Sequence, residues 1–240
     1  WWRTVDRWSL AAAVGLFLIG LLLALAAAAP LAERNGLPQY HYVIRQAVFG
    51  IAAMAGMVWL SLQTPRTIRR LGLAGFAGAV LALALLPVLG TDFGKGAVRW
   101  YSLGFASLQP SEFLKPVFAV FCAWLMSASF VPDGPPGKFL SFIAAVIVAA
   151  MLALQPDFGQ TALILALWGG MYFVAGASPT LLVAMAGAAT GAAALAYQNS
   201  AHFARRIDGF LAPDVGPYTQ LAFALDAIRA GGLFGVGVGE

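Results

Sequence analysis

Residues 109–116 read Gln-Pro-Ser-Glu-Phe-Leu-Lys-Pro and open a run from Pro116 to Pro132 that carries no charge. Such a run is typical of a helix that crosses a membrane. Glu112 and Lys115 therefore lie at the mouth of a predicted membrane helix, three residues apart and on one helical face. Moving a charge out of water costs about 2.5–3.5 kcal/mol near the bilayer centre on insertion scales, and less near the interface. Charged residues in this position therefore usually have a partner or a function.

The rest of the chain is as apolar as this segment. Of its 240 residues, 61% are hydrophobic and 10% are charged, and the hydrophobic residues come in long uninterrupted runs. This composition predicts an all-α fold, a polytopic membrane helix bundle that forms a single transmembrane domain over residues 1–240. Seven membrane spans are predicted, at about 9–29, 43–62, 71–90, 111–130, 138–155, 158–176 and 180–198.

The distribution of basic residues predicts the orientation of these spans. Short cytoplasmic loops are rich in Lys and Arg, and basic residues precede the first span and crowd the predicted loop after the second: Arg3, Arg7, Arg66, Arg69 and Arg70. The amino terminus is therefore expected in the cytoplasm. Counting spans then puts segments 30–42, 91–110 and 199–240 outside, the last as a long outer segment. The cations in these outer segments indicate an anionic substrate.

Two short segments, QPSE at 109–112 and QPDF at 155–158, share one pattern. Gln precedes a predicted helix, Pro lies in its first turn, where a missing N–H costs nothing, and an acid complements the positive end of the helix dipole. Two spans separate the segments, so both helix starts should face outside, where their free N–H groups could bind phosphate. Gln109, Gln155 and Asp157 are therefore candidate substrate-binding residues. Plain capping with a stabilising Glu112–Lys115 ion pair stays open as an alternative.

Residues 94–100, GKGAVRW, join two cations, two glycines and an aromatic ring in the predicted outer loop. Lys95 and Arg99 could bind phosphate, and Trp100 could stack on a sugar ring. An interfacial Trp flanked by snorkelling cations is the competing interpretation. Arg45, at the outer start of the second span, is a further candidate of the same kind.

The sequence predicts no metal site. Its single cysteine, Cys122, lies within the fourth span, which excludes a disulfide framework and leaves no metal-ligand spacing. The glycine run at 235–239 has no preceding strand and is interpreted as a flexible turn rather than a nucleotide loop. The expected surroundings are a membrane, and no nucleic-acid partner is predicted.

Five motifs in order along the chain closely resemble the SEDS family (shape, elongation, division and sporulation), most of all its cell-division members and their alphaproteobacterial forms. The ordered set covers nearly the whole chain and is far more specific than any single motif. The motifs are GAVRW at 96–100, QPSEFLK at 109–115, QPDFGQT at 155–161, FLAP at 210–213 and GGLFGVG at 231–237.

The resemblance implies a bundle of ten transmembrane helices, of which about seven are present here, with segment 199–240 as the start of a large periplasmic loop after the seventh. It implies a peptidoglycan glycosyltransferase that polymerises lipid II, a disaccharide-pentapeptide on undecaprenyl pyrophosphate, during septal cell-wall synthesis and cell division. Glu112 and Lys115 would be the family's functionally required intramembrane pair, with Asp157 near the same outer cavity. The expected catalytic aspartate belongs to a His-Thr-Asp-Phe motif beyond Glu240, so this chain is expected to be an inactive amino-terminal part.

The hypothesis for the mechanism is an inverting glycosyl transfer. The acceptor 4-hydroxyl attacks the donor's anomeric carbon as pyrophosphate leaves, while Lys95, Arg99 and Arg45 neutralise the leaving group; a divalent cation, Mg²⁺ or Mn²⁺, could assist. The resemblance also implies a single-span class B penicillin-binding protein and other division proteins as partners, at the septum in the bacterial cytoplasmic membrane, with the active face in the periplasm. Two alternatives stay open: a lipid II transporter (flippase) and a non-catalytic division scaffold.

Overall fold

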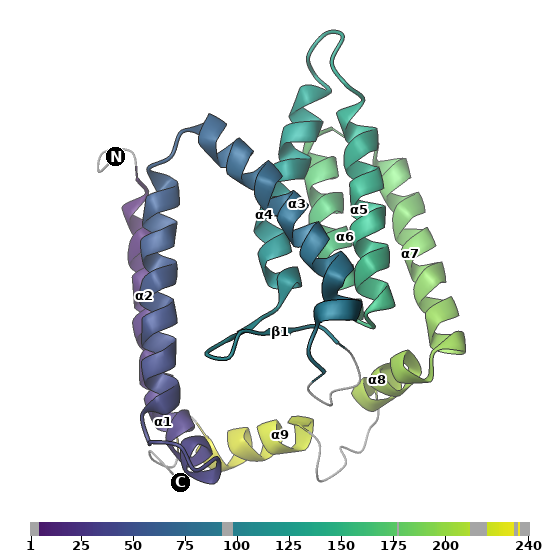
Figure 1. Cartoon of the computed structure of the whole chain (residues 1–240). Coiled ribbons are helices and arrows are strands. Elements are labelled where there is room, and N and C mark those ends of the chain that lie inside the picture. The colour runs from purple at the N-terminus through teal and green to yellow at the C-terminus, as the bar shows by residue number, and fades with distance from the viewer. Residues whose placement is uncertain (1–4, 93–97, 177, 212–219, 233–234, 236–240) are drawn as a thin grey trace. The chain divides into compact units, whose positions relative to one another are not determined.

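The computed structural model consists almost entirely of helices (Figure 1). It describes residues 5–92, 98–176, 178–211, 220–232 and 235. Two short strands, β1 (Tyr101–Ser102) and β2 (Ser107–Leu108), pair antiparallel. The predicted all-α fold is confirmed by the helices α1 (Arg7–Arg34), α2 (His41–Ser61), α3 (Pro65–Leu89), α4 (Pro110–Ala128), α5 (Gly137–Leu154), α6 (Phe158–Val174), α7 (Pro179–Asn199), α8 (Ala201–Leu211) and α9 (Gln220–Gly231).

Six helices in the described ranges, α1 to α5 and α7, are long and apolar enough to cross a membrane. α6 is apolar too but has only 17 residues. At 1.5 Å per residue it is about 26 Å long, slightly less than a hydrocarbon core of about 30 Å. Each of the seven predicted spans is therefore a helix, and the sixth is the shortest of them.

The start of α3 corrects one prediction. The helix begins at Pro65, where Pro is favoured because its missing N–H has no helical partner. Thr64 caps it by accepting a hydrogen bond from the Thr67 N–H at 3.3 Å. Three residues predicted to lie in the preceding loop are therefore inside the helix, in its first two turns: Arg66, Arg69 and Arg70.

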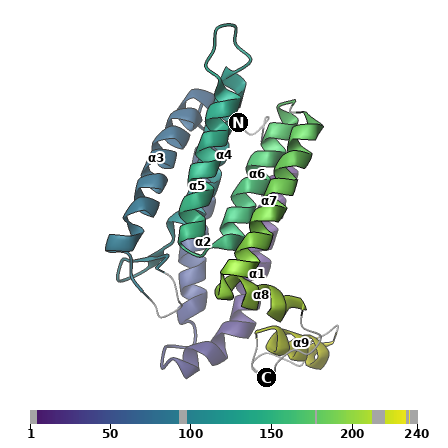
Figure 2. The same ribbon diagram turned by 90° about the vertical axis from the view of Figure 1, so that its right-hand side faces the viewer.

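Residue contacts divide the chain into two units, one formed by residues 64–193 and one by residues 1–63 with 194–240. In the first unit α4 is central, because α3, α5 and α6 all pack against it (Figure 2). The other unit contains α1 and α2 and, toward the carboxyl end, α8 and α9.

Neighbouring helices of the first unit run antiparallel. Gly72 of α3 lies against Val120 of α4, and Gly75, one turn later, lies against Val117, one turn earlier. The start of α5 at Gly137 then meets the end of α4. Consequently the α3–α4 connection and the α5–α6 junction lie at the same end of this unit. The helix starts at 110 and 158 therefore lie on the same side, as predicted. That this is the outer side stays a prediction.

The core of this unit forms around α4. Leu114, Phe118 and Cys122 have no exposed surface, so the single thiol is buried. Trp168 of α6 is 1% exposed, and its indole N–H donates to the buried hydroxyl of Ser141 on α5 at 3.2 Å. This bond satisfies the polar atom of a buried aromatic ring and ties α5 to α6.

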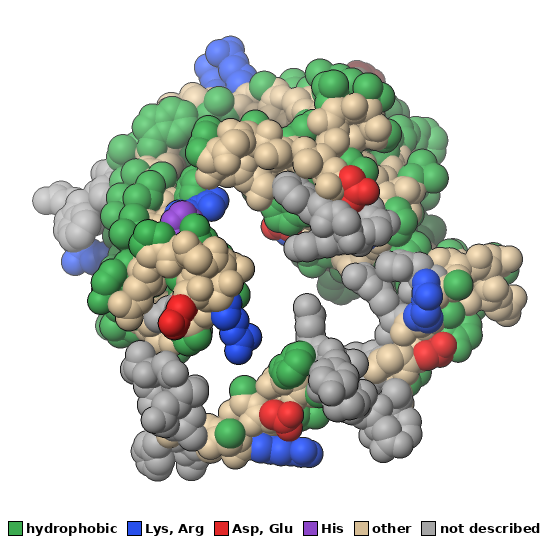
Figure 3. All heavy atoms as spheres, turned by 60° about the horizontal axis from the view of Figure 1, so that its bottom comes forward, with side chains coloured by type: hydrophobic (Ala, Val, Ile, Leu, Met, Phe, Trp, Pro, Cys, Tyr) green, Lys and Arg blue, Asp and Glu red, His purple; other side chains and the backbone are tan. Residues whose placement is uncertain are grey.

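In the other unit α1 and α2 form an antiparallel pair (Figure 1). Gly50 of α2 lies against the ring of Phe17, so a side chain there would collide with it. Across the turn, Asn35 Nδ2 donates to the Tyr42 hydroxyl at 2.8 Å. Most side chains of this pair are exposed, and hydrophobic side chains cover much of the face in Figure 3. Such exposure suits helices surrounded by lipid.

The described residues of segment 199–240, which was predicted to begin a large outer loop, form the helices α8 and α9. α9 carries Leu221, Leu225 and Ile228. The Tyr197 hydroxyl at the end of α7 donates to Asp208 of α8 at 2.6 Å. The side of the membrane on which this segment lies stays a prediction.

Candidate functional site

The polar side chains singled out in the sequence gather where α3 ends, α4 begins and α5 turns into α6. The described part of the α3–α4 connection is a small ribbon, in which Tyr101 pairs with Leu108 and Ser102 with Ser107. An isolated bridge between Thr91 and Trp100 closes its base. This ribbon brings residues 98–109 over the end of the helix cluster.

The start of α4 has the predicted form. Gln109 is the N-cap, Pro110 occupies the first helical position and Glu112 lies in the first turn. The Gln109 side chain makes no capping hydrogen bond. Lys115 Nζ lies 2.7 Å from Glu112 Oε2, so the predicted ion pair is present. The Glu112 side chain is 49% exposed, which leaves one side of the carboxylate accessible to a ligand.

Glu112 has a second partner, which sequence reasoning missed. Gln160 of α6 donates from Nε2 to Glu112 Oε1 at 2.7 Å, across 48 residues of sequence. Both carboxylate oxygens are therefore engaged, one by an ammonium group and one by an amide. The sequence contained one signal for this contact: a polar Gln in the first turn of an apolar helix, within the motif at 155–161.

The start of α6 differs from that of α4, which corrects the prediction of one shared pattern. Asp157 is itself the N-cap, 8% exposed, and its Oδ1 accepts from the Gln160 N–H at 3.5 Å. Gln155 and Pro156 precede the cap because the N–H groups of Gln155 and Asp157 both donate to the carbonyl of Leu152 and close α5. Pro156 is therefore not in the first turn of α6.

Arg99 and Gln155, two predicted substrate-binding residues, bond to the main chain. Arg99 donates from Nε to the carbonyl of Gln155 at 3.0 Å and from Nη2 to that of Pro156 at 2.6 Å. Gln155 Nε2 donates to the carbonyl of Leu83 on α3 at 3.2 Å. These three bonds tie the α3–α4 connection, the α5–α6 junction and α3 together.

Trp100 and its neighbour Tyr101 support the same end. The carbonyl of Trp100, which is half-buried, accepts from the Thr91 N–H at 2.8 Å. The Tyr101 hydroxyl donates to the carbonyl of Ala82 at 2.6 Å. Burial raises the pKa of Tyr101 above its usual value, because the ionised form would lose hydration. Tyr101 therefore stays protonated and remains a hydrogen-bond donor.

Two other candidates lie elsewhere. Arg45 is an exposed residue of α2, with its guanidinium 5.9 Å from the centre of the Phe49 ring. It belongs to the other unit, formed by residues 1–63 with 194–240. Lys95 lies outside the described residues.

The described residues do not fit a resident metal ion. No three His, Cys, Asp or Glu side chains among them gather into a group that could hold one. Both oxygens of Glu112 are already bonded, and Asp157 Oδ1 accepts a backbone N–H.

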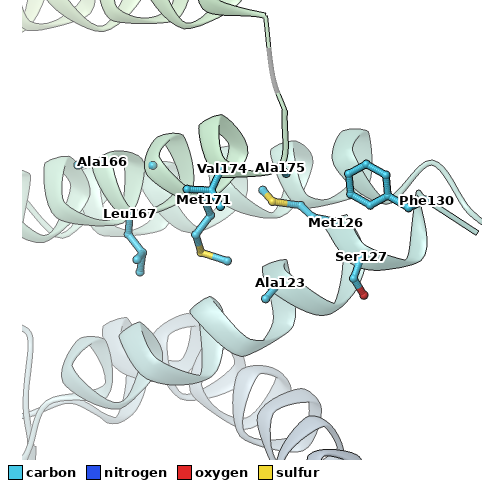
Figure 4. Close-up of a pocket in the computed structure, with 10 residues that line it drawn as sticks. Ala123, Met126, Ser127, Phe130, Ala166, Leu167, Met171, Val174 and Ala175 are labelled. Atoms are coloured by element: carbon cyan, nitrogen blue, oxygen red, sulfur yellow. The ribbon is translucent and has the colours of Figure 1, made fainter. Parts of the chain in front are cut away.

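A cavity of about 570 Å³ lies between the carboxyl-terminal halves of α4 and α6 (Figure 4). Ser127 supplies its only side-chain hydroxyl, and none of its lining residues is charged; they are Ala123, Met126, Ser127, Phe130, Ala166, Leu167, Gly170, Met171, Val174 and Ala175. It lies at the end of the helices opposite Glu112. Such a lining suits an apolar group rather than a phosphate.

Comparisons with known proteins agree with the resemblance seen in the sequence. The FtsW/RodA/SpoVE family, described as cell cycle protein, matches residues 7–240. A probable peptidoglycan glycosyltransferase FtsW of Caulobacter vibrioides is 37% identical over 100% of this chain, and one of Halorhodospira halophila is 32% identical over 99%. The chain spans 62% of the length of each of these two relatives.

Solved structures share the fold. A chain of a peptidoglycan synthase complex, described as coordinating polymerization and crosslinking, matches with a TM-score of 0.70 at 22% identity, over 95% of this chain and 66% of that one. The crystal structure of the rod shape determining protein RodA of Thermus thermophilus matches with a TM-score of 0.59 at 25% identity, over 78% of this chain and 59% of that one.

Proposed function

Because this chain belongs to the FtsW/RodA/SpoVE family of cell cycle proteins, we propose that the whole protein is a peptidoglycan glycosyltransferase that polymerises lipid II in septal cell-wall synthesis. The names of the two relatives compared above support the activity, and the fold shared with a chain of a peptidoglycan synthase complex supports its setting. The chain spans 62% of those relatives, so the proposal concerns the full-length protein.

The observation that carries the proposal is the cluster of Glu112, Lys115 and Gln160. It joins the first turns of α4 and α6 through two bonds of 2.7 Å to one carboxylate. An ion pair this close to an apolar helix is costly unless it serves structure or function. The half-exposed carboxylate suits the hydroxyl and amide donors of a polar headgroup, while the cations that the sequence places in the adjoining connection would attract the anionic part of that headgroup.

The proposed reaction is an inverting glycosyl transfer. The 4-hydroxyl of the acceptor sugar forms a bond to the anomeric carbon of the donor, the bond from that carbon to pyrophosphate breaks, and the hydroxyl proton leaves to a base. Cations near the leaving group stabilise the charge that develops on pyrophosphate. Lys95 is proposed for this role, while Glu112 and Lys115 hold the start of α4 in place.

The orientation is part of the proposal. The end of the 64–193 unit opposite Glu112 carries four cations, Arg66, Arg69, Arg70 and Lys138, and this excess supports a cytoplasmic location for that end. The Glu112 end then faces the periplasm, where lipid II would be joined. We propose a single-span class B penicillin-binding protein as the partner at the division septum, which the likeness to the synthase complex supports.

The test uses the full-length protein, purified in detergent and supplied with lipid II. Polymer is measured as glycan strands separated on a gel. Glu112→Ala should abolish polymer formation, because Lys115 and Gln160 then both lose their acceptor. The partly buried ammonium group of Lys115 is also left without its ion-pair partner. Glu33→Ala, a change of an exposed acid in α1, is the matched control and should keep the wild-type rate.

A charge-swapped variant separates function from simple stabilisation. Glu112→Lys combined with Lys115→Glu restores an ion pair at the same spacing, but a lysine at position 112 cannot accept the hydrogen bond from Gln160. Polymerisation should therefore stay lost. Wild-type activity in the swapped variant would mean that the pair serves only to stabilise the bundle, and wild-type activity in Glu112→Ala would refute a role for Glu112.

A further inference from the structure

Gln160 holds the carboxylate of Glu112 from a different helix. Lys115 is on the same helix as Glu112, three residues away, so their ion pair constrains α4 alone. The amide of Gln160 approaches from α6 and donates at 2.7 Å to the oxygen that Lys115 does not use. The direction of the carboxylate is therefore fixed by the position of α6.

The first turn of α6 is held in place by contacts that do not involve Glu112. The carboxylate of Asp157 caps the turn at the Gln160 N–H, and the Thr161 hydroxyl donates back to the Asp157 carbonyl at 2.9 Å. Arg99 bonds the two carbonyls just before the cap. The side chain of Gln160 thus projects from a turn held by three separate contacts.

The chemistry of an amide suits this place. The NH₂ group must face Glu112, since the carbonyl oxygen would repel the carboxylate, and this fixes which way the amide points. Gln160 Oε1 is then buried and has no partner among the described residues. A side chain that makes one strong bond and leaves its other polar atom unsatisfied is costly to retain for packing alone.

Among the described residues, the charged groups at this end are Glu112 and Lys115 on α4, Asp157 at the cap of α6, and Asp92 and Arg99 in the α3–α4 connection. The arginines of α3 and Lys138 of α5 lie at the opposite end, because both helices run antiparallel to α4. A new charge at position 160 would therefore interact first with Glu112.

We propose that Gln160 is a positioning residue for lipid II polymerisation, which holds the Glu112 carboxylate in the orientation that the reaction requires and couples it to α6. This inference rests on the proposed function. Gln160 acts through Glu112 and need not touch the substrate. Its loss should therefore lower kcat more than it changes KM.

The test measures polymerisation by the full-length protein over a pH series. Gln160→Leu, similar in size but unable to donate, should lower kcat by about tenfold or more at every pH. Gln160→Glu places a carboxyl group against Glu112. When protonated it can donate the same hydrogen bond, and when ionised it repels Glu112, because two adjacent carboxylates resist joint ionisation. Its activity relative to wild type should therefore rise as pH is lowered from about 8 to about 5.5.

Gln63→Glu is the matched control, because Gln63 donates to the carbonyl of Trp59 and has no carboxylate partner. Its pH profile should follow wild type. The inference is overturned if Gln160→Leu polymerises at the wild-type rate, or if Gln160→Glu shows the pH profile of wild type, a readout that stays valid even if Gln160→Leu does not fold. Absence of polymer from wild-type protein would instead overturn the proposed function, and the inference with it.

Discussion

The guanidinium of Arg99 binds main-chain carbonyls, although the sequence suggested that it binds phosphate. The sequence offered a cation beside glycine and tryptophan, a pattern that suits phosphate. Its acceptors lie 56 and 57 residues away, at the carbonyls of Gln155 and Pro156. Two parallel donors in one plane match two neighbouring carbonyls, a geometry that Arg provides and Lys does not.

Arg99→Lys should therefore destabilise the protein. A single ammonium group cannot reproduce both bonds, and losing one charge-assisted bond costs about 1.5–3 kcal/mol. Thermal unfolding of the full-length protein in detergent should show a lower Tm. Arg34→Lys, a conservative change at the exposed end of α1, should leave the Tm unchanged. An unchanged Tm in Arg99→Lys together with a higher KM for lipid II would instead assign Arg99 to the leaving group.

Gln160 shows the limit of sequence reasoning at the same scale. The pair of Glu112 and Lys115 could be predicted because helical periodicity fixes which residues share a face. The partner on α6 could not, since a single sequence does not report which turn of one helix faces which turn of another. Lys95 stays a prediction, because it lies outside the described residues.

The starts of α4 and α6 show the same limit of sequence reasoning at the scale of secondary-structure elements. QPSE and QPDF look alike, yet Pro110 begins α4 whereas Pro156 precedes the cap of α6. The difference comes from the end of α5, whose last carbonyls capture the N–H groups of Gln155 and Asp157. Each predicted span could be located from a run of apolar residues, because the thickness of the bilayer sets the length of such a run. The start of α3 was missed because arginines were interpreted as loop residues, although Thr64 and Pro65 signal a helix start.

Close packing of α3 on α4 depends on Gly72. A Cβ at this position would collide with the side chain of Val120, including its own Cβ, which cannot rotate away. Gly72→Ala should therefore destabilise the protein by about 1–3 kcal/mol through overpacking. The measurement is thermal unfolding of the full-length protein in detergent.

Gly78, two turns further along α3, supplies the matched control. A Cβ there meets nothing within 4 Å, so Gly78→Ala should be neutral or should stabilise by up to about 1 kcal/mol from the better helix propensity of Ala. Equal Tm values for the two alanine variants would show that α3 and α4 do not approach as closely at Gly72 as described here.

Over the 64–193 unit, charged side chains lie at the two ends and apolar ones between them, as in a membrane-spanning bundle. One end carries the basic residues of α3 and α5 with Asp133 in the α4–α5 loop, whereas the other brings Arg99, Glu112, Lys115 and Asp157 together. Composition alone predicted such a bundle. The convergence of four segments at one end required that each helix from α3 to α6 runs antiparallel to the one before it.

The most direct measurement reconstitutes the full-length protein in liposomes and adds lipid II to the outer leaflet only. A cysteine is introduced at an exposed position near the cluster, Ser107→Cys, because the native Cys122 is buried. Labelling of this cysteine by a membrane-impermeant maleimide shows in which molecules the Glu112 end faces outward. Polymer should form without translocation, in an amount that rises with the labelled fraction and falls to zero in Glu112→Ala. Polymer that rises instead with the unlabelled fraction, or lipid II that crosses the membrane without being joined, would contradict polymerisation at the Glu112 end.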